Sequence, residues 1–189
     1  MTHTEIVNKV KSILNEHGEV DAVSIGEDRV LLEDYIESAI PDAVIMLAQK
    51  GYRVNVKTLH NVDFEDDTVI QDGDFVSLIL VRSPQWKKVV TKLTDMNSPE
   101  YVMAQNDFTR PGAHSPIVFW DGAELYSIPG AGSEAVVVYN AKYNADNGIE
   151  AEPKEATAVC YMTAALVSGM FGDDQGKQRL SDIATNMLQ

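Results

Sequence analysis

Residues 117–139 read IVFWDGAELYSIPGAGSEAVVVY and contain the clearest β-structure signal in the chain. The runs 117–120 and 123–128 flank Asp121-Gly122, a pair that tolerates the positive φ angles of a type I′ turn, so they predict a hairpin. The β-branched run 135–139 predicts a strand that pairs back. The middle of the chain is therefore expected to be antiparallel β structure.

Two further strands are predicted upstream of this hairpin. Tyr52, Val54 and Val56 alternate with polar residues, which is strand spacing. The run 75–81 follows a turn signal and has the composition of a buried strand. With a turn at Asn147-Gly148, the β-rich region is expected to cover about residues 52–150.

The chain before this region is predicted to be helical, over about residues 3–51, because apolar residues recur there at 3.6-residue spacing. Thr2 and Glu5 fit a capping box, in which each side chain satisfies a free backbone amide of the first turn. Gly18 fits the end of the first helix. Pro41 removes a backbone donor inside the second helix, which predicts a kink or two abutting helices.

Helical spacing returns over about residues 153–189. Pro153 suits the first turn of a helix. Gly172 is expected to end that helix, and Asp173-Asp174 would place negative charge at the positive end of the next one. The fold class predicted for residues 1–189 is α+β, as a single domain. In it, N- and C-terminal helices form a bundle, and the central antiparallel β-rich region is an insertion.

The chain is strongly acidic, with 29 Asp and Glu against 15 Lys and Arg and a formal net charge of −14. Such a chain is not expected to bind nucleic acid through its general field, since phosphate contacts require Lys and Arg. Acidity also favours solubility, which is the simpler interpretation. No secretory signal is visible at the start. The longest apolar runs are far shorter than the ~20 residues that span a bilayer, so we expect a soluble protein.

No residue pattern predicts catalysis, a cofactor or a metal. Residues 129–133 resemble a phosphate-binding loop but lack the Gly-Lys-Ser/Thr ending. The acidic residues Asp63 and 65–67 could bind a cation, but a solvated loop is the better interpretation. The four histidines are scattered, and the single cysteine, Cys160, lies on an apolar helical face, where a buried thiol is inert. We therefore expect a non-enzymatic protein without cofactors.

Trp86-Lys87-Lys88 is a cationic spot beside an aromatic residue. It can be interpreted as packing, with the lysine stems lying on the indole, or as a contact surface, because aromatic residues are enriched at interfaces. Packing is the favoured interpretation, since Trp so often serves that purpose.

Several short motifs of the central region carry a family resemblance. They are SLILVRSPQWKKVVTKL at 77–93, SPEYVMAQNDFTRPG at 98–112 and SPIV at 115–118, followed by the Asp121-Gly122 hairpin. Their order resembles that in the head–tail adaptor, or ring, proteins of tailed bacteriophages, notably those of the crAss-like phages. That family has a similar layout, with two helices before the β region and two after it.

The resemblance implies a structural protein of the virion, located at the head–tail junction and in the host cytoplasm during assembly. Its partners would be the portal protein, neighbouring adaptor or tail proteins, and further copies of itself in a ring through whose channel DNA passes, with twelve copies as one option. Basic residues would then face protein neighbours, and the residues proposed for such an interface are Trp86, Lys87, Lys88, Arg110 and Phe171. The alternatives are a tail-completion or tail-tube protein, a host protein-binding module and, last, a small enzyme.

Overall fold

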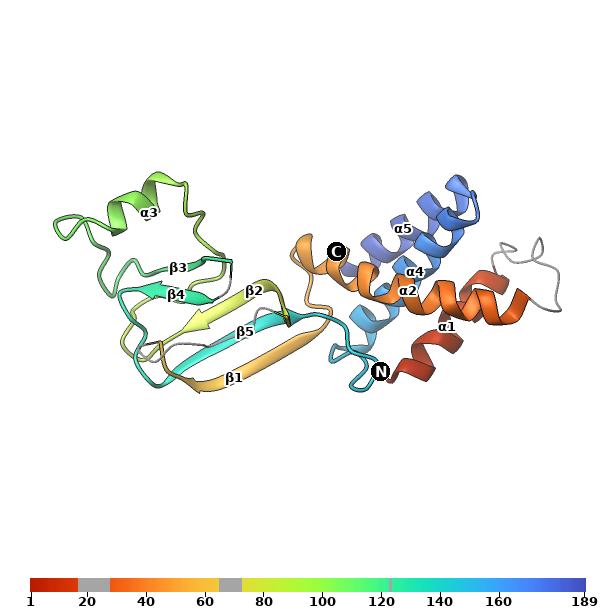
Figure 1. The fold of residues 1–189 in the computed structure, drawn as a ribbon, viewed down its shortest axis with the longest axis horizontal. Helices are drawn as coiled ribbons and strands as arrows, with labels where there is room; N and C mark the ends of the chain where they lie inside the picture. The colour runs from red at the N-terminus through yellow and green to blue at the C-terminus, as the bar shows by residue number, and fades with distance from the viewer. Residues whose placement is uncertain (17–27, 65–72, 123) are drawn as a thin grey trace. The chain divides into compact units, whose positions relative to one another are not determined.

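The computed structural model describes residues 1–16, 28–64, 73–122 and 124–189 (Figure 1). The described chain mixes helices with antiparallel strands, so the α+β class is confirmed. It divides into two compact units. The helical unit comprises Met1–Val56 and Lys142–Gln189, and the β unit comprises Lys57–Ala141. The β unit spans fewer residues than the β-rich region 52–150 that the sequence predicts.

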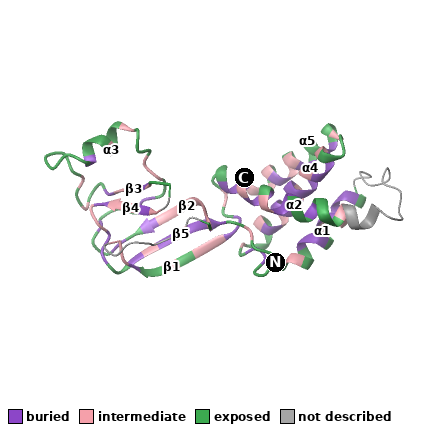
Figure 2. Cartoon of the chain, viewed as in Figure 1, coloured by how far each residue is buried: buried purple, intermediate pink, exposed green. Residues whose placement is uncertain are grey.

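The helical unit contains α1 (His3–Glu16), α2 (Asp28–Gln49), α4 (Pro153–Met170) and α5 (Asp174–Leu188). Helix α4 contacts each of the other three. It is apolar on most sides, with ten buried residues, and this explains its central position. Figure 2 shows the contrast between the buried α4 and the exposed outer surfaces of α2 and α5.

The predicted helix ends agree with the structure wherever it describes them. The Thr2 backbone N–H donates to Glu5 Oε2 at 2.8 Å, and the Glu5 N–H donates to Thr2 Oγ1 at 3.3 Å, which confirms the capping box. These hydrogen bonds to Thr2 hold the pKa of Glu5 below its usual value. Pro153 begins α4, and Asp173 caps α5 by accepting from the Gly176 N–H at 2.9 Å. The predicted stop at Gly18 lies outside the described residues.

Pro41 lies inside one continuous helix, α2, so of the two predicted alternatives the pair of abutting helices is wrong, and the kink stays a prediction. The apolar face continues through the proline. Ile36 and Ile40 before it, and Val44 and Leu47 after it, are all fully buried. Burial of a large aliphatic side chain contributes about 1.5–3 kcal/mol, so packing on both sides offsets the one lost hydrogen bond.

The β unit contains two sheets. A three-stranded sheet has the order β1 (Val56–Val62), β5 (Ala135–Ala141), β2 (Phe75–Arg82), and β5 pairs antiparallel with β2. A two-stranded sheet pairs β3 (Ile117–Trp120) with β4 (Leu125–Ile128). A short helix, α3 (Pro99–Ala104), precedes β3 and was not predicted.

The first predicted strand begins later than expected. Residues 52–55 are not in a strand, and β1 starts at Val56. The side chain of Asn55 explains the difference, because it is buried and bonds the backbone of the returning chain. Its Nδ2 donates to the Lys142 carbonyl at 3.0 Å, and its Oδ1 accepts from the Glu150 N–H at 3.1 Å.

The β3–β4 hairpin is confirmed, but its type I′ turn is not. Trp120 pairs with Leu125, so four residues form the loop. Gly122 has φ +109°, whereas Asp121 does not have a positive φ. Instead, Asp121 Oδ1 accepts from the Glu124 N–H at 2.8 Å. This side-chain bond closes the wider loop, as Asp commonly does in turns.

Candidate functional site

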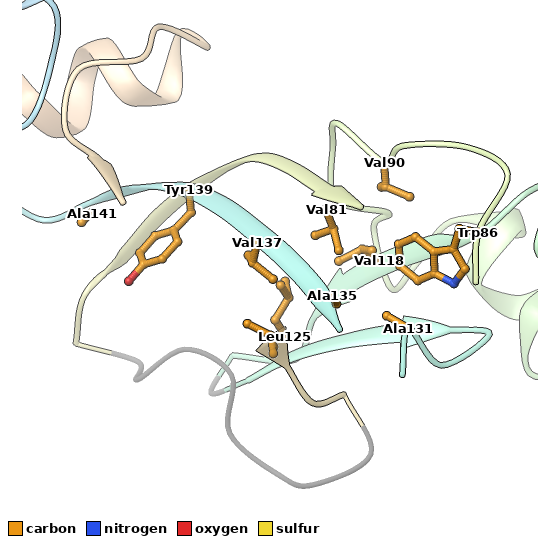
Figure 3. Close-up of a cluster of buried hydrophobic side chains, with 11 residues drawn as sticks. Val81, Trp86, Val90, Val118, Leu125, Ala131, Ala135, Val137, Tyr139 and Ala141 are labelled. Atoms are coloured by element: carbon orange, nitrogen blue, oxygen red, sulfur yellow. The ribbon is translucent and has the colours of Figure 1, made fainter. Parts of the chain in front are cut away.

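Trp86 is a packing residue of the β unit. Its side chain is 7% exposed and belongs to a cluster of buried residues to which all five strands, β1 to β5, contribute. Figure 3 shows the indole close to Val118 and Ala131. Its Nε1–H is buried and has no hydrogen-bond partner among the described residues. The burial supports the packing interpretation of this residue.

The backbone around Trp86 is held by hydrogen bonds at several points. Val81 and Val90 form an antiparallel bridge, with N–H to carbonyl distances of 2.7 and 2.9 Å. Between them, the Trp86 N–H donates to the Ser83 carbonyl at 3.1 Å, and the Ser83 hydroxyl donates to the Ala131 carbonyl at 2.5 Å. The chain between Val81 and Val90 is therefore a fixed loop on the surface of the β unit.

This loop and the residues just after it carry exposed cations. We call Arg82, Lys87, Lys88 and Lys92 the cationic loop, and all four side chains are exposed. No Asp or Glu occurs between residues 75 and 94. The Lys87 N–H donates to the Ala113 carbonyl at 2.8 Å, which joins this loop to the segment that follows Arg110.

A second exposed surface follows it in the chain. We call residues 98–110 the α3 loop, and three of its apolar side chains face solvent: Val102 is 63% exposed, Met103 51% and Phe108 98%. Arg110 is exposed at its end. Exposed apolar side chains that lie together mark interaction sites more often than isolated ones do.

Polar residues fix the conformation of the α3 loop. Ser98 Oγ accepts from the Tyr101 N–H at 3.3 Å and caps α3. Asn106 Oδ1 accepts from the Phe108 N–H at 2.9 Å, and the Thr109 hydroxyl donates to the Met103 carbonyl at 2.6 Å. The loop is folded by these bonds, while Phe108 itself remains exposed.

Sequence reasoning missed α3 and the exposure of Phe108. The sequence did contain a signal for the helix, since Ser98-Pro99-Glu100 combines an N-cap residue, a proline in the first turn and an acidic residue. The exposure of Phe108 was not predicted, because a phenylalanine is ordinarily expected in a core even where, as here, its sequence neighbours are polar.

Phe171 belongs to the helical unit, whereas the other four proposed interface residues belong to the β unit. It follows α4 and is 44% exposed. Its ring contacts Tyr35 of α2 edge to face, with centroids 5.1 Å apart, and Tyr35 is 40% exposed. Met170, which precedes Phe171 in the sequence, is 49% exposed.

Burial is the main cause of the raised pKa values of Cys160 and Tyr139. Burial raises the pKa of the Cys160 thiol to about 11, so it is protonated at neutral pH. Burial, with the Asp74 carboxylate beside it, raises the pKa of Tyr139 to about 12. The Tyr139 hydroxyl donates to Asp74 Oδ2 at 3.1 Å, and Lys57 Nζ donates to the same oxygen at 2.7 Å. This network joins neighbouring strands.

Residues 129–133, the loop with two glycines, lie between β4 and β5 and open no helix. Within the described ranges, no three His, Cys, Asp or Glu side chains are grouped so that they could hold a metal ion. No described helix is both long and apolar enough to cross a membrane. Of the acidic residues 63–67, Glu65, Asp66 and Asp67 lie outside the described residues.

No protein-family model matches the chain, and no curated protein matches its sequence significantly.

Proposed function

We propose that this chain is a structural head–tail adaptor of a tailed bacteriophage, which docks beneath the portal as part of a ring around the DNA channel. The family resemblance described above leads to this proposal, and the α3 loop supports it. The motif residues Ser98, Asn106 and Thr109 form the bonds that fold this loop. Between them they leave Phe108 exposed to solvent. A motif that holds an aromatic side chain exposed to solvent suits a protein whose task is to bind other proteins.

The layout of the chain is also compatible with an adaptor. The helices at both ends would form a bundle that docks onto the portal, and the β unit would reach toward the next ring or the tail. Docking of this kind requires exposed apolar anchors surrounded by polar residues. Phe108 with Arg110, and Phe171 with Tyr35, are the anchors that the described residues offer.

The test is binding to the portal protein encoded by the same genome. Purified portal rings are mixed with the chain, and the mass of the complex is measured by light scattering. Phe108→Ser is expected to weaken binding at least tenfold, since a central aromatic anchor contributes 2 kcal/mol or more, roughly. The matched control is Met96→Ser, which removes a 38% exposed apolar side chain of the same unit outside the α3 loop. A chain that shows no portal binding would refute the proposal.

A further inference from the structure

The cationic loop places four positive charges on the surface of a chain with a net charge of −14. Among the described residues, none of its four side chains forms an ion pair or a hydrogen bond, although carboxylates outnumber cations almost two to one. Val89, which is 44% exposed, lies among them. The loop therefore has the character of a surface for an acidic partner with an apolar contact.

The loop is also held ready for binding. The Val81–Val90 bridge, the bond from Lys87 to the Ala113 carbonyl and the buried Trp86 hold its backbone. A partner would have to order the lysine side chains but not the loop. A preorganised loop of this kind lowers the entropic cost of association.

A surface of opposite charge lies on α2. Asp34, Ser38, Asp42 and Met46 follow one another at four-residue spacing, so they form a row along the helix, which we call the acidic α2 row. All four are exposed. Asp34 and Asp42 form no side-chain hydrogen bond or ion pair with any described residue, and α2 has no Lys or Arg after Arg29.

Apolar side chains accompany the acidic α2 row. Met46 is 38% exposed, and Tyr35, next to Asp34 in the sequence, is 40% exposed and rests against Phe171. Tyr, Phe and Met are enriched at protein interfaces relative to the rest of the surface. The acidic α2 row is therefore complementary to the cationic loop in two respects. Its carboxylates can pair with the cations, and its apolar side chains can pack against Val89.

We propose that the cationic loop of one copy binds the acidic α2 row of a second copy. The two surfaces differ, so the contact is heterologous and each copy has one of each to offer. Repetition of such a contact gives a closed ring or an open filament. The inference deepens the proposed function and rests on it, because it supplies the contact between subunits of the ring.

The choice of a second copy over nucleic acid follows from charge. A DNA phosphate would meet these four cations but also the field of a chain with net charge −14, which opposes the approach of a polyanion. A second copy presents its carboxylates locally, beside apolar groups that match Val89. Binding through such pairs weakens as salt screens them.

Charge reversal on either surface tests the proposal. Self-association of the full chain is measured at low salt by sedimentation over a range of concentrations. Both Lys87→Glu/Lys88→Glu and Asp34→Lys/Asp42→Lys are expected to weaken it at least about tenfold, because like charges then face each other across the contact. The control variants carry the same charge changes at other exposed positions and should associate as the wild type does. They are Lys142→Glu/Lys154→Glu and Asp146→Lys/Glu134→Lys.

Mixing the two reversed variants gives the decisive result. In an equal mixture, the carboxylates at positions 87 and 88 of one variant face the lysines at positions 34 and 42 of the other. The remaining pair of surfaces, the unchanged cationic loop and the unchanged acidic α2 row, is also complementary. Association is expected to return in the mixture and in the variant that combines all four substitutions. A variant that merely failed to fold could not be rescued in this way.

The proposal is overturned if the wild type stays monomeric at every concentration, or if the mixture stays dissociated. It is also overturned if Lys87→Glu/Lys88→Glu instead abolishes binding to duplex DNA, which would make nucleic acid the occupant. Portal binding is scored separately. Self-association that is lost and rescued as expected, without any portal binding, would uphold this contact and refute the adaptor function.

Discussion

Truncation of Trp86 to Ala should destabilise the β unit by about 3–4 kcal/mol. The side chain is 7% exposed, so nearly all of its surface is buried. About 200 Å² of buried aromatic surface at about 25 cal/mol per Å² contributes about 5 kcal/mol. The buried Nε1–H has no hydrogen-bond partner, which costs about 1–2 kcal/mol of stability, and truncation to Ala removes this cost. The remainder agrees with the ~3–5 kcal/mol usual for Trp→Ala in a core.

The chain itself contains a reporter for this measurement. Its two tryptophans are Trp86 and Trp120, and both lie in the β unit. Trp120 stacks on Phe75 with ring centroids 4.6 Å apart, so its fluorescence reports unfolding when Trp86 is replaced. Urea denaturation of Trp86→Ala followed by Trp120 fluorescence gives the free energy of unfolding.

Two further variants separate packing from charge. Lys87→Gln/Lys88→Gln removes two exposed cations and should change the free energy of unfolding by at most about 0.5 kcal/mol per site. Trp86→Phe keeps an aromatic ring and removes the unpartnered N–H. It should therefore lower the free energy of unfolding by less than half as much as Trp86→Ala does. If Trp86→Ala leaves the urea midpoint unchanged, or if the double lysine variant is the less stable one, the packing argument is wrong.

Three other predictions concern different parts of the molecule. Burial and a nearby carboxylate raise the pKa values of Tyr139 and Tyr143 to about 12, above the ordinary value of about 10. Their contribution to stability is full below about pH 10 and is lost as the pH rises toward 12. In a pH titration followed by phenolate absorbance, these two tyrosines should therefore ionise at higher pH than an ordinary tyrosine, and Tyr139→Phe should remove one of the two steps. Gly148→Ala should lower the melting temperature more than Gly51→Ala. Both glycines have positive φ, but only a Cβ at Gly148 would meet backbone, 2.3 Å from the Met1 carbonyl oxygen. Finally, linear duplex DNA at low salt should show no gel shift at micromolar protein, because the chain repels phosphate overall.

The helical elements were largely predictable from the sequence. In α1, the five apolar residues at helical spacing are the five buried ones: Ile6, Val7, Val10, Ile13 and Leu14. Local signals sufficed there, because a capping box and a 3.6-residue period act over one or two turns. Pro41 suggested two abutting helices as one alternative, but its local cost is offset by burial against α4, a helix more than a hundred residues away in the sequence.

The sheet order and the exposed surfaces could not be predicted in the same way. Strand β5 pairs with β2 across some 60 residues and not with the hairpin next to it in sequence. Such pairing depends on which faces become buried together, and this is not a local property. The exposure of Phe108 depends on bonds made by Asn106 and Thr109, and a lone sequence pattern does not reveal these bonds.

The residues that hold segment 81–113 in place differ from the groups that this segment exposes. Lys87 illustrates the separation within one residue, because its backbone N–H bonds the Ala113 carbonyl while its side chain faces solvent. Trp86 beside it is buried, and Lys88 is exposed. A substitution of the lysine side chains therefore leaves the anchoring bonds intact, whereas a substitution of Trp86 removes packing. If substitution of the lysine side chains abolishes assembly but leaves the free energy of unfolding unchanged, the lysines belong to an interface. If the same substitution lowers both assembly and the free energy of unfolding, the whole segment has a purely structural role.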